Sequence, residues 1–488
     1  MEDLIMACTT ILAGKKATYN GSTMIARNDD GFFDVKKLVI VDSKKQPRKY
    51  KSKIAHLTID LPDNPLRYTS TPSVDLSSGI WAANGINELN VAMTATETVT
   101  TNPLVMGADP YVKYQKAKGN KKEVPGGIGE EDLVVLVLPY IKSAREGVLR
   151  LGSLLETYGT YESNGIAFSD KDEIWWLETI GGHHWIARRV KDEEVVIMPN
   201  QFGLDCFDME DALNEGKENL CSKDLKEFIE KNHLLMDGER FNPRVAFGSH
   251  SDADHVYNTP RGWYMGRYFN PTKYKWDGEN ADFNPQSDNI PWSFIPEKKV
   301  TVEDIKYVLS SYYQGTPYNP HGKDPKKGIY RPIGISRTGV MAVLEIRNNV
   351  PKEISAIEWI CFGCNAYNAM IPLYADVDRL PAYVSNTTLT VDTNSFYWTS
   401  RLIAAMGDQN FKTCVMDIER YQGAMANKGH QLINEYDAKI LETKDYSLKY
   451  EANNKLCEMA KEEADNALNK ILMDASKNMT VGYSRADN

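Results

Sequence analysis

Runs of β-branched and apolar residues, separated by turn residues, fill the first hundred positions of the chain. They predict five strands, at residues 8–14, 22–30, 37–42, 54–61 and 90–97. The Tyr19-Asn20-Gly21 turn lies between the first two runs, so we expect those strands to form a hairpin.

A helical pattern follows at residues 130–158, where an acidic first turn leads into apolar residues at helical spacing. A second block of strands comes next, and we expect it to form a meander. Its four runs are 165–169, 173–179, 184–190 and 194–199.

The stretch 206–330 is polar and rich in Asn-Pro and Thr-Pro steps, which favours binding loops. Strand patterns return at 340–346 and 357–362, and the chain reads as helical after residue 395. No internal repeat or low-complexity linker interrupts the sequence, so one compact unit with a helical C-terminal part is expected.

Composition excludes several classes. Hydrophobic residues make up 42% of the 488 positions and charged residues 25%, as in ordinary globular proteins. The net charge of −10 leaves no strong electrostatic footprint for nucleic acid. The longest apolar run, 133–141, contains Pro139 and falls short of the about 20 residues that span a membrane. We therefore expect neither nucleic acid nor a membrane as a partner.

Seven cysteines, odd in number and scattered, do not form the pattern of a disulfide framework. They suit a reducing compartment, and we expect a cytoplasmic protein. The segment Ile5-Met6-Ala7-Cys8 looks like the end of a lipoprotein signal, but the preceding residues include Glu2 and Asp3 and supply no apolar core for such a signal.

Cys8 is well placed to become a new N-terminus. Cleavage between Ala7 and Cys8 would free an α-amine with a pKa of about 7.7–8.0, which can accept the proton of the thiol. One residue would then hold both the nucleophile and its base. The alternative is a small apolar cysteine on a core strand.

The surrounding residues favour the first interpretation. Cys8-Thr9-Thr10, followed by Arg27-Asn28-Asp29-Asp30, resembles the start of the N-terminal nucleophile cysteine hydrolases, which carry a terminal Cys-Thr and then Arg-Asn-x-Asp. A tight hairpin would bring Arg27 and Asp30 close to Cys8. There Arg27 would bind substrate and favour the thiolate, and Asp30 would hold the α-amine. The alternative for both residues is an exposed ion pair of little consequence.

Further strings narrow the resemblance to the dipeptidase A family of bacterial cysteine dipeptidases, which are related to the secernins. They are GIAFSDKDEIWWLE at 165–178, GHHW at 182–185, HSDADHVYNTPR at 250–261 and RPIGISRT at 331–338. The resemblance covers residues 8 to about 375. It implies cleavage of dipeptides, no cofactor and an α+β fold, a four-layer αββα sandwich.

On this basis we expect a short propeptide at 1–7 and a hydrolase domain at 8–395. The helical part, 396–488, would pack on the same unit or serve assembly, and a homo-oligomer is expected.

The wider superfamily includes choloylglycine and penicillin V acylases, whose pattern can be carried over residue by residue. It implies that Asn200 donates to the oxyanion and that Arg261 is catalytic; their alternatives are a turn residue and a surface pair. The acylases' second oxyanion asparagine falls near Thr94 and Thr96, where this sequence departs from the pattern. His183 and His184 point to opposite faces of a strand, and we expect His184 to line the substrate pocket.

Three other interpretations stay open. One is an acylase that uses the same nucleophile on N-acyl amides. Another is a metal-dependent hydrolase that uses His250, Asp252, Asp254 and His255, although no second ligand cluster supports it. The third is a non-catalytic scaffold that binds partners through its helical tail.

Overall fold

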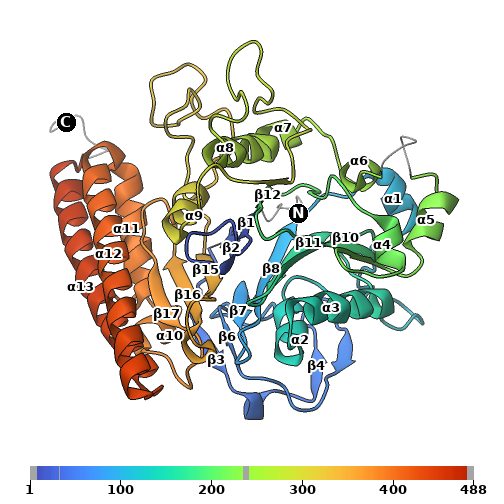
Figure 1. The fold of residues 1–488 in the computed structure, drawn as a ribbon, viewed down its shortest axis with the longest axis horizontal. Coiled ribbons are helices and arrows are strands. Elements are labelled where there is room, and N and C mark those ends of the chain that lie inside the picture. The colour runs from blue at the N-terminus through green and yellow to red at the C-terminus, as the bar shows by residue number, and fades with distance from the viewer. Residues whose placement is uncertain (1–7, 32, 235–240, 481–488) are drawn as a thin grey trace.

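The computed structural model describes residues 8–31, 33–234 and 241–480. Two large antiparallel sheets lie at the centre of this part of the chain, with helices on their outer sides (Figure 1). The expected α+β class is therefore confirmed. The predicted propeptide 1–7, with Ala7 of the expected cleavage site, lies outside the described residues.

The seven-stranded sheet contains the predicted N-terminal hairpin. Its strands, in spatial order, are β14 (Ser293–Phe294), β12 (Val195–Met198), β1 (Thr9–Ala13), β2 (Thr23–Asp29), β15 (Val340–Ile346), β16 (Ala356–Phe362) and β17 (Ile371–Tyr374). In the hairpin, Thr9 lies opposite Asn28 and Thr10 opposite Arg27. The end of β2 therefore returns to the start of β1, as the sequence predicts.

The six-stranded sheet contains most of the predicted meander. Its strands, in spatial order, are β13 (Asn219–Cys221), β11 (His184–Val190), β10 (Ile174–Ile180), β9 (Asn164–Ser169), β8 (Ala92–Thr98) and β7 (Asn84–Ile86). Two shorter pairs form separate small sheets, namely β3 (Val39–Val41) with β6 (Tyr68–Ser70), which packs beside β7, and β4 (Lys49–Lys51) with β5 (Thr58–Asp60).

The prediction that residues 194–199 form the fourth strand of the meander is wrong, because β12 crosses to the other sheet and pairs with β1. All four of its residues are buried. Val195 and Ile197 belong to one hydrophobic cluster, whereas Val196 and Met198 belong to another. A strand that is apolar on both faces needs cover on both sides, and a position inside the seven-stranded sheet provides it.

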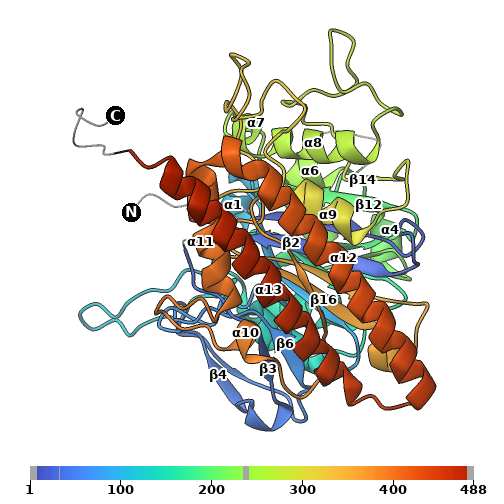
Figure 2. The same ribbon diagram turned by 90° about the vertical axis from the view of Figure 1, so that its left-hand side faces the viewer.

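Helices cover the outer faces of the two sheets. On the six-stranded sheet lie α2 (Leu133–Val137) and α3 (Ala144–Tyr158), separated by a 3-10 turn, Leu138–Tyr140, that contains Pro139. The proline therefore divides the predicted 130–158 helix. On the seven-stranded sheet lie α11 (Phe396–Gln409), α12 (Phe411–Thr443) and α13 (Leu448–Lys477), which cross β16 and β17 (Figures 1 and 2).

Shorter helices occupy the loop-rich middle and the remaining connections. They are α1 (Pro103–Ala108), α4 (Met209–Leu213), α5 (Leu225–Lys231), α6 (Pro243–Phe247), α7 (Asp254–Tyr257), α8 (Thr259–Phe269), α9 (Val302–Leu309) and α10 (Ala382–Ser385). None of the described helices is both long enough and apolar enough to cross a membrane.

Strand alternation distributes the apolar side chains among three buried clusters. On β1, Ile11 faces the cluster beneath α9 and α11–α13, while Leu12 faces the cluster between the sheets. On β10, Trp176 faces that intersheet cluster, while Trp175 packs in the third one, beneath α2 and α3. Successive residues of a strand point to opposite faces, so the two sheets separate these cores.

Candidate active site

Cys8 lies immediately before β1 and is fully buried. Its Sγ accepts a hydrogen bond of 2.8 Å from Nη2 of Arg27, a residue of β2. The hairpin register explains this contact, because Arg27 stands opposite Thr10, two residues after the cysteine. A thiol and a guanidinium are thus placed together by adjacent strands.

The Arg27 guanidinium has several other partners. It donates to Oε1 of Glu130 at 2.8 Å and, through Nε, to the carbonyl oxygen of Thr96 at 2.6 Å. Its Nη1 lies 3.1 Å from a carboxylate oxygen of Asp29. These contacts fix the side chain rigidly, but they leave little of it to grip a substrate carboxylate, the task we considered for it.

The thiol is surrounded by opposing charges. Burial raises the pKa of Cys8 well above its usual value, and Arg27 lowers it, while Glu130, Glu97 and Asp29 raise it further. Arg27 therefore acts in the direction that the sequence predicts, but it does not prevail. In this chain, where the nitrogen of Cys8 is still joined to Ala7, the thiol is held protonated.

No sequence motif assigns Asp29, Glu97 or Glu130 a role at the site. Ligand-type atoms of Cys8, Asp29 and Glu130 lie within 4.8 Å of one another. Glu97 accepts a 2.7 Å hydrogen bond from Thr10, and burial raises its pKa to about 8. The acidic run that begins at Glu130 predicts only the start of a helix, and nothing local indicates that it reaches β2.

Asp30 is buried at the end of β2, and an arginine balances its negative charge. Its carboxylate accepts 2.6 Å and 2.7 Å hydrogen bonds from Arg331 and from the hydroxyl of Thr338. Both partners belong to the 331–338 string that supported the resemblance. The structure thus brings that string to the hairpin that carries Cys8.

Arg261, on α8, ties the start of β1 to the end of β12. Its Nη1 donates to the carbonyl oxygen of Cys8 at 2.5 Å and to the hydroxyl of Thr9 at 2.6 Å. Its Nη2 donates to Oδ1 of Asn200 at 2.8 Å and to Oδ1 of Asn258 at 2.9 Å. The guanidinium is completely buried, and burial, with Arg331 adding to the effect, lowers its pKa to about 9.

Asn200 is oriented by that contact and by a second one. Its Nδ2 donates to the carbonyl oxygen of Thr98 at 3.0 Å, so its carbonyl faces Arg261 while its amide faces β8. The side chain is nearly fully buried. Arg261 therefore fixes the orientation of the predicted oxyanion donor, with its own guanidinium enclosed by protein oxygens.

The predicted substrate-binding residues lie in different places. Thr94 accepts a 3.1 Å hydrogen bond from the backbone nitrogen of Ala167, near the irregular pairing of β8 and β9. Thr96 contacts the site through its carbonyl oxygen and Arg27. His184 lies elsewhere, bonded to Asp109 at 2.7 Å and stacked on Phe228, and its described contacts do not include the Cys8 cluster.

The four residues of the metal alternative do not converge. Asp254 accepts from the backbone of Ser251 at 2.9 Å and from Asn258 at 2.5 Å, and so stabilises the start of α8. His255 and His250 both approach Asp288 instead, at 3.1 Å and 3.9 Å. Within the part of the chain that the structure describes, ligand-type atoms gather only at Cys8, Asp29 and Glu130, so this alternative has no geometric support.

A cation beside the thiol, as Arg27 is beside Cys8, is one feature of the reactive cysteines of hydrolases. The family model described as Peptidase family C69 matches residues 7–424, and the chain belongs to that family. Its identification as a cysteine-type peptidase is thereby confirmed.

Three curated relatives extend this result. The chain is 56% identical to "Dipeptidase" of Bifidobacterium longum over 444 residues, which cover 89% of this chain and 83% of that protein. It is 49% identical to "Probable dipeptidase A" of Streptococcus pyogenes serotype M3, over 99% of this chain and 100% of the relative. It is 40% identical to "Dipeptidase A" of Lactobacillus helveticus, over 98% and 99% of the two chains.

Proposed function

We propose that this protein is a cysteine dipeptidase whose nucleophile is Cys8, made N-terminal by removal of residues 1–7. The hydrogen bond between Sγ of Cys8 and Nη2 of Arg27, at the head of β1, is the observation that carries the proposal. The names of the relatives, dipeptidases that match nearly the whole chain, supply the substrate class.

The proposed reaction begins with a proton transfer within Cys8. Once the bond to Ala7 is cut, the free α-amine, with a pKa of about 7.7–8.0, takes the thiol proton. The thiolate attacks the peptide carbonyl, and Asn200 with a backbone N–H donates to the oxyanion, an interaction worth about 3 kcal/mol of barrier. The α-ammonium then protonates the leaving amine, and water hydrolyses the acyl-enzyme.

Glu130 is placed to give the enzyme a preference for substrates with a free N-terminus. A carboxylate oxygen of Glu130 lies within 4.8 Å of the Cys8 sulfur. In a peptide substrate the α-ammonium nitrogen is only about 2.5 Å from the carbonyl carbon of the same residue. An ammonium bound by Glu130 would therefore place the first peptide bond of the substrate, and no later one, at the nucleophile.

Asp30 is proposed to hold the α-amine of the processed Cys8. Its full burial and its pairing with Arg331 and Thr338 support a fixed orientation for this carboxylate. A substrate carboxylate would have to displace a protein partner of Arg27 or Arg261, since the guanidinium groups of both are already engaged. Thr94, Thr96 and His184 stay predictions as substrate-binding residues.

We further propose that the fold is the four-layer αββα sandwich of the N-terminal nucleophile hydrolases. Its support is the order of the packed elements, with α2 and α3 on one sheet and α11–α13 on the other. The three hydrophobic clusters, one between the sheets and one under each set of helices, agree with four layers.

The proposed cellular setting is the cytoplasm, with a homo-oligomeric enzyme. All seven cysteines are free thiols in the structure, which fits a reducing compartment. Light scattering on the purified protein would test the oligomeric state.

The deciding experiment is intact-mass analysis with N-terminal sequencing of the wild type and of Cys8→Ala, with Cys221→Ala as a matched control thiol. We expect wild type and control to begin at Cys8 and to hydrolyse dipeptides. Cys8→Ala should keep its leader and lose turnover. Active wild-type protein that retained residues 1–7 would overturn the mechanism, because Cys8 would then have no free amine.

Two assays distinguish the dipeptidase from the remaining alternatives. A dipeptidase should cleave dipeptides and leave bile-salt and penicillin amides intact, whereas an acylase should do the reverse. A thiol alkylator should abolish the activity of a cysteine enzyme, and a chelator should not.

A further inference from the structure

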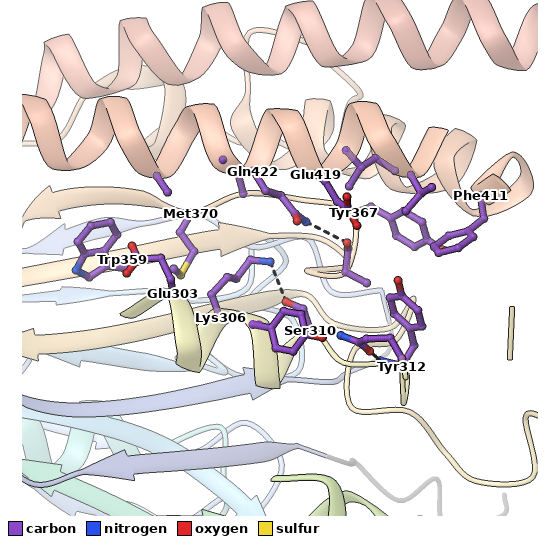
Figure 3. Close-up of a pocket in the computed structure, with 18 residues that line it drawn as sticks. Glu303, Lys306, Ser310, Tyr312, Trp359, Tyr367, Met370, Phe411, Glu419 and Gln422 are labelled. Carbon is purple, nitrogen blue, oxygen red and sulfur yellow. Dashed lines mark hydrogen bonds between the residues drawn. The ribbon is translucent and has the colours of Figure 1, made fainter. Parts of the chain in front are cut away.

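A pocket that none of the residues around Cys8 lines lies between α9, the connection from β16 to β17, and α12 (Figure 3). It encloses about 390 Å³, within the range of small-molecule sites. Trp359 and Met370 lie at one end and Tyr312, Tyr367 and Phe411 at the other, with Lys306 between them. Most of its lining is therefore aromatic or aliphatic.

Lys306 projects from α9 into this pocket. Its Nζ donates to the hydroxyl of Ser310 at 2.8 Å and to the carbonyl oxygen of Asn365 at 2.7 Å, which are both neutral groups. Among residues 8–31, 33–234 and 241–480, no carboxylate lies within 4 Å of this ammonium. Burial lowers the pKa of Lys306, which shows that the surroundings penalise its charge.

The carboxylates at the pocket do not balance that charge. Glu303 accepts a 2.6 Å hydrogen bond from His430, which raises the pKa of the histidine and supplies Glu303 with its own cation. Glu419 also lines the pocket, at an exposed position of α12, but its carboxylate does not come within 4 Å of the Lys306 ammonium. A lysine in apolar surroundings without a counter-charge is rare in proteins, because the cost of desolvating it is not offset.

We propose that this pocket binds a small monocarboxylate with an apolar or aromatic body, whose carboxylate pairs with Lys306. The aromatic side chains on either side would pack against the body of the ligand. Lys306 is the one lysine or arginine in the described lining, so a single negative charge is favoured over a phosphate, which usually recruits several donors. This inference does not depend on the proposed dipeptidase activity.

Titration calorimetry with two acids and their matched alcohols tests the charge requirement. The probes are 3-phenylpropionate and octanoate, compared with 3-phenylpropanol and octanol. We expect the acids to bind the wild type and to bind Lys306→Met about ten-fold to a hundred-fold more weakly, the loss of one charge-assisted hydrogen bond. The alcohols should bind both proteins equally, and Lys412→Met, an exposed lysine of the same helix as Phe411, should behave as wild type.

A second pair of variants tests where the acids bind and leaves the charge of Lys306 unchanged. A Cβ added at Gly423 of α12 would meet no atom within 4 Å, so a larger side chain there can enter the pocket. Gly423→Leu should abolish binding of both acids, while Gly423→Ala should retain most of it. Neither should lower the melting temperature, since both residues favour a helix more than glycine does.

Two results would overturn the proposal. One is that neither acid binds the wild type at millimolar concentration. The other is that Lys306→Met and Gly423→Leu, folded by their melting temperatures, bind the acids as tightly as the wild type.

Discussion

At Cys8, a cation and three carboxylates act on one thiol in opposite directions. Arg27 stabilises the thiolate, whereas Glu130, Glu97 and Asp29 destabilise it, and burial adds to their effect. If these carboxylates served only to suppress the thiol, they would work against catalysis. Binding a cationic group of the substrate would give Glu130 a use in catalysis, which its effect on the pKa of Cys8 does not.

If Glu130 binds the substrate ammonium, Glu130→Gln should change which substrates the enzyme prefers. The wild type should prefer a dipeptide with a free α-ammonium over its N-acetyl form by about ten-fold or more in kcat/KM. Glu130→Gln should lose most of that preference, mainly through a higher KM for the free dipeptide. The measurement is steady-state kinetics on the two substrates.

Glu131→Gln is the matched control, because Glu131 belongs to the same acidic run but contacts Tyr161 and Ser52 instead of Arg27. It should retain the preference. If Glu130→Gln lowered the rates for both substrates equally, Glu130 would only position Arg27 and would not bind the ammonium.

At the scale of elements, the sequence predicts what depends on neighbours in the chain. The hairpin of β1 and β2 follows from two apolar runs and a turn, and its register places Arg27 near Cys8. Glu130 reaches Arg27 across 103 positions, and no local pattern encodes that contact. Arg261 and Asn200 were found by resemblance alone, since 61 positions separate them and their meeting depends on how α8 packs on β12.

Arg261 connects helix α8 to the start of β1 and to the end of β12. We predict that Arg261→Lys lowers the free energy of unfolding by about 3 kcal/mol, because a lysine lacks the planar fork and leaves Asn200 and Asn258 without donors. Dipeptidase activity should fall as well. Urea unfolding and the dipeptide assay are the measurements.

Arg267→Lys, in the same helix, provides the comparison. Arg267 is partly exposed and pairs with Asp277 at the surface, so its replacement should change stability by less than about 0.5 kcal/mol. Equal effects of the two substitutions would show that Arg261 has no special structural role.

The C-terminal helices are joined to the sheet by a buried ion pair. Arg347, just after β15, donates to Asp437 of α12 at 2.6 Å, and the hydroxyl of Tyr374 on β17 donates to the same carboxylate at 2.7 Å. We predict that Asp437→Asn destabilises the protein by about 3 kcal/mol, because it leaves Arg347 buried without a counter-charge.

A double substitution separates the charge from the packing. Arg347→Met combined with Asp437→Leu should recover most of the lost stability, as an apolar pair of similar volume often does. Thermal unfolding measures both proteins. A double variant as unstable as Asp437→Asn would show that packing, and not the unpaired charge, causes the loss.

For the whole molecule, several buried carboxyl groups set how stability depends on pH. Burial raises the pKa of Glu178 and of Glu358 to about 7, and that of Glu162 to about 8. Such a group is protonated in the folded state but ionised in the unfolded state between its two pKa values. Stability is therefore lost as pH rises from about 4.5 towards 8.

Asp109 has the opposite effect at acid pH. Burial raises its pKa, but hydrogen bonds from His184 and His183 outweigh burial and lower it to about 2. The stability that this carboxylate contributes is present above its usual pKa and is lost as pH falls towards 2. We therefore expect the stability that these groups contribute together to be highest between about pH 3.8 and 4.5.

Glu358 provides the test of this balance, since it lies on β16, beside the edge strand β17, and is completely buried. Glutamine keeps its shape without an ionisable proton, so Glu358→Gln should be more stable than its parent by about 2–3 kcal/mol at pH 8 and equal to it at pH 4.5. Urea unfolding at both values measures this in a Cys8→Ala background, which keeps every sample in one covalent state. The exposed Glu442→Gln should show no such difference, and a gain for Glu358→Gln that was equal at both pH values would mean that its carboxyl group does not titrate in this range.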